Sequence, residues 1–336
     1  MELTEIASGL SLIKDLPLSA RYNMRIVDKR TSNNRTGDLG PKDRQLKLRA
    51  MHEVEVFLAG RAGKYLSFFG ELEAEDEWPD PNGDGPGFQV QFAMGTAQLN
   101  LHEALRVSLG FGPIFWADGY NTLRHENFTR MDWAATEQGF VPGDGQFVGV
   151  SGRPMDRLFY NVVFSGDDGD LEGHDARSLH GRIAFDVMAA KSANLMVGTF
   201  YSASRLYDSS SGTSHDKLNR LGVDLQLETH GLGLNAIYAQ KELEPADGKS
   251  VKDDDISLEL SYLLSKNNRP VFGPALIIDK YTQKDGEDDW TKLGLFVNYF
   301  ALENLRLALG WEGTVSAPDA FQHKESRLTL VLDMGL

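Results

Sequence analysis

Hydrophobic and polar residues alternate along most of the chain. In the first clear segment, Leu18, Ala20 and Tyr22 share one face, while Arg21 and Arg25 lie on the other. This period of two predicts β-strands. Strong segments contain Leu18, Leu46, Leu66, Phe88, Leu105, Leu158, Ile183, Leu221, Ile256, Leu293, Leu305 and Leu328. Weaker segments at 146–152, 195–205, 232–241 and 271–281, whose faces the pattern leaves unassigned, bring the expected total to about sixteen strands.

The connections between these segments alternate between short and long. Short ones lie at 60–64, 100–104, 152–156, 189–194, 230–231, 265–269 and 301–304, and the longest polar one lies at 117–145. Tight turns at one rim and long loops at the other typify outer-membrane barrels. We therefore expect an all-β fold, a closed antiparallel up-and-down transmembrane β-barrel over residues 17–336, with short periplasmic turns and long extracellular loops. Residues 1–16 form a separate N-terminal segment, for which one short amphipathic helix is the candidate structure.

Alternation alone does not say which face points outward. A soluble propeller or two-sheet sandwich, the alternative fold, would bury the apolar face. Charged side chains recur on the polar faces, and about sixteen strands enclose too wide a space for Val and Leu to fill, so we expect the apolar face to meet lipid. Aromatic residues near the strand ends suggest an interfacial girdle: Tyr22, Phe115, Trp116, Tyr160, Tyr201, Tyr238, Tyr262, Trp290, Tyr299 and Trp311.

Composition narrows the possible chemistry. The chain has 336 residues, no cysteine and a formal charge of −15. The absence of cysteine excludes disulfides, thiolate metal sites, cysteine nucleophiles and covalent haem attachment through CxxCH. The acidic balance argues against nucleic-acid binding. No motif of an enzyme active site stands out, so we expect no catalytic residues and no enzymatic activity.

Charged residues on the polar faces are the candidates for the lining of a water-filled lumen. They are Arg21, Arg25, Lys47, Arg49, Glu53, Glu55, Glu71, Glu73, Arg106, Arg157, Arg182, Arg306, Glu312 and Arg327. Basic and acidic walls facing each other would set up a transverse field that orients dipolar solutes. The alternative, compatible with the first, is that these charges pair across strands and keep the lumen wet.

The connection at 117–145 is unusually rich in large rings. Candidate constriction residues in and beside it are Trp116, Asp118, Tyr120, Arg124, Arg130 and Trp133. Such a loop suits folding into the barrel and narrowing the pore. The alternative is an extracellular cap packed on its own aromatic residues.

One loop resembles the opening of a calcium-binding loop. Asp80, Asn82 and Asp84 offer oxygen ligands at alternate positions, followed by Gly85 at the sixth. The twelfth position holds Gln91 in place of the bidentate Glu, so the loop is no EF-hand. A structural calcium ion and a solvated acidic turn are the two interpretations, and no other cofactor is expected.

Two stretches carry a resemblance to a known group of proteins. They are residues 68–76, FFGELEAED, and residues 111–123, FGPIFWADGYNTL. They resemble the barrel part of porin-like outer-membrane proteins of iron- and metal-respiring bacteria, some of which are monohaem cytochrome–porin fusions. Those fusions carry a CxxCH haem segment before the first strand, which this chain lacks, so haem is expected only if a missing N-terminal segment carries it. The final Leu336 also departs from the usual terminal aromatic residue.

The resemblance and the pattern together imply a function in transport. We expect a porin in the outer membrane of a Gram-negative bacterium that lets small hydrophilic solutes or ions diffuse passively. The alternative is the barrel of an electron-transfer conduit that sheathes a haem or redox partner, and a third class is an adhesin or receptor. Expected partners are outer-membrane lipid and lipopolysaccharide, with a homotrimer and a periplasmic or extracellular cytochrome as further candidates.

Overall fold

The computed structural model describes residues 18–32, 43–76, 88–115, 117, 139–166, 177–190, 192–207, 215–245, 248–283, 289–317 and 324–335. The elements in this part of the chain are β1 (Leu18–Ser32), β2 (Asp43–Ala62), β3 (Leu66–Asp76), β4 (Phe88–His102), β5 (Leu105–Pro113), β6 (Asp144–Met155), β7 (Leu158–Gly166), β8 (Arg177–Ala190), β9 (Ala193–Tyr207), β10 (His215–Thr229), β11 (Leu232–Glu244), β12 (Val251–Tyr262), β13 (Leu264–Lys266), β14 (Arg269–Gln283), β15 (Trp290–Leu302), β16 (Leu305–Ser316) and β17 (Lys324–Gly335). No helix among these residues is long and apolar enough to cross a membrane.

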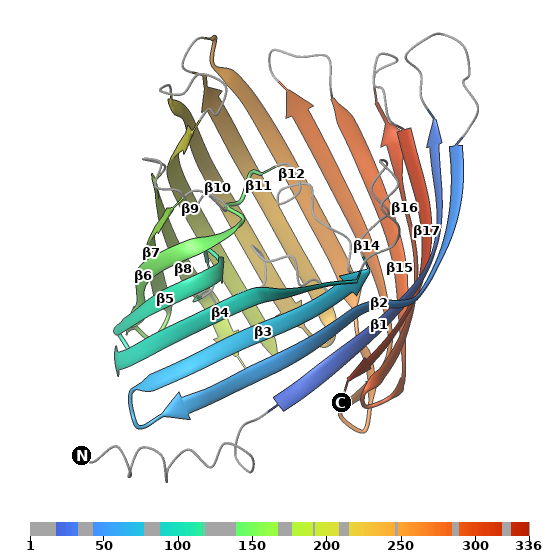
Figure 1. Cartoon of the computed structure of the whole chain (residues 1–336), viewed down its shortest axis with the longest axis horizontal. Coiled ribbons are helices and arrows are strands. Elements are labelled where there is room, and N and C mark those ends of the chain that lie inside the picture. The colour runs from blue at the N-terminus through green and yellow to red at the C-terminus, as the bar shows by residue number, and fades with distance from the viewer. Residues whose placement is uncertain are drawn as a thin grey trace.

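The strands close into a barrel. Each strand pairs antiparallel with its neighbour in the sequence, and β17 pairs with β1 along twelve residue pairs from Arg21–Gly335 to Ser32–Lys324. Strands β12 and β13 both pair with β14, so they occupy one position in the wall, interrupted at Leu263. The result is the predicted closed barrel of sixteen strand positions, up and down in order (Figure 1).

The two ends of the barrel differ as predicted. Short turns join β2 to β3, β4 to β5 and so on around one rim, where β1 also begins and β17 ends (Figure 1). Two of these turns have two residues with positive φ, His230 (48°) with Gly231 (83°) and Asn267 (53°) with Asn268 (60°). Such backbone angles match the right-handed twist of the strands, which is why Asn and Gly stand there.

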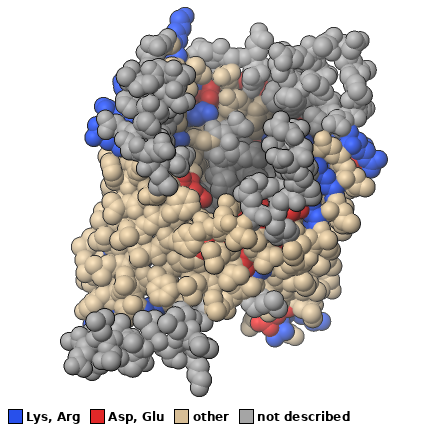
Figure 2. All heavy atoms as spheres, viewed as in Figure 1, with Lys and Arg blue, Asp and Glu red and all other residues tan. Residues whose placement is uncertain are grey.

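The apolar face points outward. Leu46 and Leu48 are 68% and 70% exposed, and Val90 is 75% exposed, whereas Asn161 and Ser202 on polar faces are buried. A soluble propeller or sandwich would show the reverse. Figure 2 accordingly shows a broad and mostly uncharged band across the face in view. Lipid is the medium that makes such a surface stable, so the barrel is a transmembrane one.

Three details differ from the sequence-based expectation. Met51 continues the alternation of Lys47 and Arg49, which predicts an inward side chain, yet it is 45% exposed, because an irregularity in the β1–β2 register between the pairs Asn23–Glu53 and Arg25–Arg49 shifts the alternation. The girdle predicted to include Phe115 and Trp290 does not contain them. Both are buried, at 2% and 6% exposure, in a cluster that includes Phe200, Ile237 and Tyr281 of the inward face.

Candidate pore interior

The interior of the barrel has an open side and a filled side. Along β17, β1 and β2 the inward side chains keep part of their surface, with Arg21 at 32%, Arg25 at 30% and Arg327 at 39%. On the opposite side, the side chains of Arg182 on β8 and Asp224 on β10 have no exposed surface. The stretch of β17 and β1 that carries these arginines is therefore more open than the wall around Arg182 and Asp224, where the inward side chains are packed.

Most of the predicted lumen residues do lie on inward-facing positions of the wall. Those on β1–β3 are Arg21, Arg25, Lys47, Arg49, Glu53, Glu55, Glu71 and Glu73, and those elsewhere are Arg106, Arg182, Arg306, Glu312 and Arg327. Arg157 is the exception, because it lies in the two-residue turn between β6 and β7 and is exposed. The alternating apolar residues that follow Arg157 in the sequence predicted a strand that begins one residue before β7 does.

Ion pairs connect neighbouring strands on the open side. Arg21 contacts Glu53 at 3.0 Å and Glu55 at 2.7 Å, and Arg49 contacts Asp76 at 3.2 Å. On β16 and β17, Arg306 donates to Asp333 at 2.8 Å and Arg327 pairs with Glu312. The charges therefore pair across strands, as one of the two interpretations of the sequence held.

The pairing leaves a separation of sign within this wall. Arg25 stands directly opposite Arg49, while Glu55 stands opposite Glu73. Like charges at directly paired positions repel each other. Arg25 on β1 thus forms a basic patch with Lys47 and Arg49 on β2. An acidic patch of Glu53, Glu55, Glu71 and Glu73 on β2 and β3 adjoins it. The two patches together would create an electrostatic field along this side of the lumen.

The filled side is built from a buried polar network. Arg182 donates two hydrogen bonds to Asp224, at 2.5 and 2.9 Å, from β8 to β10. His180 lies between Ser165 (2.9 Å) and Ser202 (2.8 Å) on the neighbouring strands. Buried polar groups need such partners, and here they tie β7, β8, β9 and β10 together from inside.

Residues from the β5–β6 connection pack against this inner wall. Phe140 is fully buried, with its ring 6.0 Å from that of Tyr281 and the Lys241 ammonium 4.9 Å from its centroid. Arg220 donates to the Gly139 carbonyl at 2.7 Å. The apolar cluster consists of Phe115, Phe140, Val141, Phe200, Ile237, Ala239, Tyr281 and Trp290. Both described ends of the connection thus lie inside the barrel.

None of the six constriction candidates is placed by the structure. Trp116, Asp118, Tyr120, Arg124, Arg130 and Trp133 all lie outside the described residues. Wall residues that contact the connection, such as Phe200 and Ile237, were not among the predicted site residues, because no apolar side chain was expected inside the barrel. A signal was present, since the segments at 195–205 and 232–241 carry apolar residues on both faces.

Carboxylates occupy much of the inner face of β12, and Asp279 on β14 lies beside them. Asp255 and Asp279 have no exposed surface, and Glu259 is 2% exposed. Asp253 pairs with Lys241 at 3.2 Å, and the Ser257 hydroxyl donates to Asp255 at 2.9 Å. This acidic strip borders the cluster that holds the β5–β6 connection.

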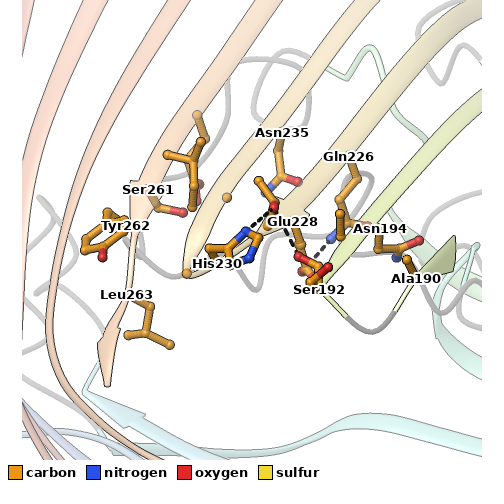
Figure 3. Close-up of a pocket in the computed structure, with 16 residues that line it drawn as sticks. Ala190, Ser192, Asn194, Gln226, Glu228, His230, Asn235, Ser261, Tyr262 and Leu263 are labelled. Carbon is orange, nitrogen blue, oxygen red and sulfur yellow. Dashed lines mark hydrogen bonds between the residues drawn. The ribbon is translucent and has the colours of Figure 1, made fainter. Parts of the chain in front are cut away.

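A cavity of about 560 Å³ lies at the short-turn end of β8–β12 (Figure 3). Polar side chains in its lining include Asn194, Gln226, Glu228, Asn235 and Glu259. Gln226 donates to Glu228 at 3.2 Å, and the Thr229 hydroxyl donates to the Ser192 carbonyl at 3.1 Å. The periplasmic mouth on this side is therefore polar and wide enough for water and small solutes.

The structure offers no metal site within the ranges it describes. No group of three or more His, Asp or Glu residues there has the geometry to hold an ion. The calcium candidates Asp80, Asn82 and Asp84 lie outside these ranges, and so does the N-terminal segment 1–16 with its expected helix. Both stay predictions.

Comparisons with known proteins address the fold. The sequence matches no protein-family model, and no curated protein matches it. Among solved structures, an anion-selective porin from Comamonas acidovorans superposes with a TM-score of 0.65 at 12% identity, over 96% of this chain and 99% of that one. The Salmonella typhi OmpF complex with daunomycin gives 0.65 at 11% identity, over 96% and 97%. OprB from Pseudomonas putida gives 0.63 at 11% identity, over 98% and 96%.

These superpositions cover almost the full length of both chains. The barrel has the fold of outer-membrane porins. Together with the exposed apolar belt, that fold places the protein in the outer membrane of a Gram-negative bacterium. The resemblance to cytochrome–porin fusions stays a prediction.

Proposed function

We propose that the protein is a porin through which small hydrophilic solutes or ions diffuse passively. The observation that carries this proposal is the open side of the interior, where the inward side chains of Arg21 and Arg25 on β1 and of Arg327 on β17 keep about a third of their surface exposed. A structural neighbour that is named as an anion-selective porin shares the fold. Polar residues also line the periplasmic mouth at β8–β12.

The path would follow the basic and acidic patches of β1–β3. A passing ion or dipolar solute would meet Arg25 and Arg49 on one stretch and Glu55 and Glu73 on the next. The β5–β6 connection would narrow the lumen from the opposite wall, against which Phe140 is anchored. Selectivity would then depend on the charges that remain accessible beside that loop.

Reconstitution into planar lipid bilayers tests this function. A porin of this kind gives stepwise openings whose current grows linearly with voltage and whose conductance grows with salt concentration. Heat-modifiable migration on a gel serves as the control for a closed barrel in the same preparation. A preparation that is heat-modifiable but never conducts would refute passive diffusion.

Passive transport also accounts for the interior better than the other function classes. A conduit for electrons needs room for a haem-bearing partner, yet side chains of β7–β15 occupy one side of the lumen. A catalytic role would need a nucleophile or acid–base pair in reach of substrate, and we propose none. No nucleic-acid partner is proposed for this acidic chain.

We further propose that the barrel assembles as a homotrimer in contact with lipopolysaccharide. Support comes from a structural neighbour, OmpT of Vibrio cholerae, which was solved in a "trimer form" and shares 10% identity. The test is native mass spectrometry of the detergent-solubilised protein. A species of three chains is expected, and a monomer at all concentrations would contradict the proposal.

A further inference from the structure

The cavity at the short-turn end of β8–β12 is lined by two rows of inward-facing residues. In the row that lies deeper in the barrel, the directly paired positions are Gln226, Asn235 and Glu259. In the row nearer the rim, the directly paired positions are Asn194, Glu228, Gly233 and Ser261. Figure 3 shows Gln226, Glu228 and Asn235 close together, with Asn194 and Ser261 on either side of them. We refer to these two rows as the vestibule lining.

Gly233 opens the space in the middle of the vestibule lining. It lies directly between Glu228 on β10 and Ser261 on β12. A Cβ atom at Gly233 would lie 2.7 Å from the Ser261 hydroxyl oxygen, so a larger residue would fill this part of the cavity. The cavity has a volume of about 560 Å³, which lies within the range of roughly 300–1,000 Å³ that small-molecule sites occupy.

The vestibule lining carries negative charge. Glu228 is exposed to the cavity, and Glu259 is 2% exposed at its edge. Among the described residues that line the cavity, none is Lys or Arg. Glu259 is also the end of the acidic strip of β12 that lies nearest the short-turn rim. A solute with a positive charge therefore matches this part of the mouth better than an anion does.

Carboxylates elsewhere near the same rim are paired with arginines. Arg153 contacts Asp186 at 2.8 Å on the β6–β8 side, and Arg306 donates to Asp333 at 2.8 Å on the β16–β17 side. The described hydrogen-bond partner of Glu228 is instead the neutral Gln226 amide, at 3.2 Å. The cavity thus differs from its surroundings in the kind of group that accompanies its carboxylate.

The side-chain amides of the vestibule lining narrow the class of ligand. Each amide of Asn194, Gln226 and Asn235 has an acceptor oxygen and N–H donors. An alkylammonium ion has donors only, so it matches the carboxylates but leaves amide N–H groups without an acceptor. Hydroxyl groups both donate and accept, so a solute with hydroxyls beside its ammonium group matches carboxylates and amides together.

We propose that the vestibule lining binds a small hydroxylated organic cation, of the amino-sugar class, at the periplasmic mouth of the barrel. The ammonium group lies between Glu228 and Glu259, in the space that Gly233 leaves open. The hydroxyl groups lie against the amides of Asn194 and Asn235. This inference rests on the proposed pore function, because it names a solute class for the same lumen.

Saturation-transfer NMR on the full chain tests the binding without requiring conduction. A polyoxyethylene detergent is used, because its headgroup is neither a sugar nor charged, and the pH is mildly acidic so that amines are protonated. The probes are glucosamine, glucose and ethylammonium. Wild type is expected to bind glucosamine about tenfold or more tightly than glucose, since a charge-assisted hydrogen bond contributes at least that factor. Ethylammonium should bind several-fold more weakly than glucosamine, because it lacks the hydroxyls.

Two variants separate the roles of charge and amide. E228Q/E259Q keeps the shapes of both side chains and should abolish the preference for glucosamine over glucose. Asn235→Leu should reduce the preference for glucosamine over ethylammonium while leaving the affinity for ethylammonium within about twofold of wild type. The matched control E103Q/E303Q removes two exposed carboxylates from short turns of the same rim outside the cavity, and it should change neither preference.

Two further variants test the space itself. Gly233→Val fills the gap between Glu228 and Ser261 without changing any charge, and it should weaken glucosamine binding about tenfold or more. Lys191 lies outside the described residues, between the lining residues Ala190 and Ser192, so Lys191→Gln is measured as well. Its affinity for glucosamine should stay within about twofold of wild type. Heat-modifiable migration shows that each variant is folded.

Several outcomes would overturn the proposal. These are equal binding of glucose and glucosamine by wild type, equal losses in E228Q/E259Q and E103Q/E303Q, unchanged binding in Gly233→Val, or binding that appears only in Lys191→Gln, which would mean that an ammonium group of the chain occupies the space. Bilayer conductance of the same preparations keeps the two proposals apart. A barrel that conducts without preferring glucosamine refutes this inference alone, whereas a barrel that binds glucosamine and never conducts refutes passive diffusion.

Discussion

Arg182 on β8 and Asp224 on β10 meet across the intervening strand because Gly198 on β9 leaves the space between them. A Cβ atom at Gly198 would lie 2.6 Å from an Asp224 carboxylate oxygen and 2.9 Å from both terminal nitrogens of Arg182. The two side chains are fully buried and doubly hydrogen-bonded. One residue without a side chain thus permits a polar clamp that spans three strands.

Loss of the Asp224 charge should destabilise the barrel. In Asp224→Asn the buried guanidinium of Arg182 loses the carboxylate beside it, which costs about 3–5 kcal/mol for a buried pair. The temperature of the heat-modifiable gel shift measures the change. Glu303→Gln, in a pair with Arg269 that is more than 70% exposed, is the control and should shift it little. Equal shifts in both variants would contradict a structural role for the clamp.

A side chain at Gly198 should have a similar effect by steric means. Gly198→Ala forces Arg182 and Asp224 apart, and overpacking of this kind costs about 1–3 kcal/mol. Gly181→Ala is the matched control, because its new Cβ faces open space. Urea unfolding in detergent micelles, followed by intrinsic fluorescence, distinguishes the two. The idea fails if both glycine variants unfold at the same urea concentration.

Release of the β5–β6 connection should widen the pore. Phe140→Ala removes the ring that packs on Tyr281 and under Lys241, which are the contacts that hold this segment to the wall. Single-channel conductance is expected to rise, and its noise with it. Phe185→Ala removes an outward ring that is 45% exposed and should leave conductance unchanged. An unchanged conductance in Phe140→Ala would show that the connection does not limit flow.

Charge reversal in the basic patch should change ion selectivity. The double variant R25E/K47E turns an inward basic stretch of β1 and β2 acidic, so the reversal potential in a salt gradient should move towards cation preference. Arg30→Glu changes a residue on the outer face of β1 and should have no such effect. Equal reversal potentials in wild type and R25E/K47E would place the ion path elsewhere.

The wall can be predicted from the sequence, because the alternation of apolar and polar residues in each strand shows which side chains face lipid and which face the interior. Alternation such as that of Leu46 and Leu48 with Lys47 and Arg49 identifies both the strand and its two faces, and the structure confirms the fold, the closure and the outward apolar belt. The pattern works here because lipid and water differ strongly as solvents. Where the inner surface is also apolar, as at Ala275 and Ile277 on β14, no contrast remains and the faces could not be assigned.

The interior is harder to predict from the sequence, because it depends on contacts between distant segments. Nothing local in Phe140 indicates that its ring lies against Tyr281. The pairing of Arg182 with Asp224 likewise depends on strand register, and on a glycine that a period-two pattern treats as neutral.

The pairing of β17 with β1 also bears on how the molecule comes into being. Until β17 has left the ribosome, β1 lacks one of its two neighbours, and an incomplete wall would expose a row of unpaired backbone amides to hydrocarbon. Synthesis of these strands and their insertion into the membrane must therefore be separate events, with the barrel segment kept unfolded until β1 and β17 can pair.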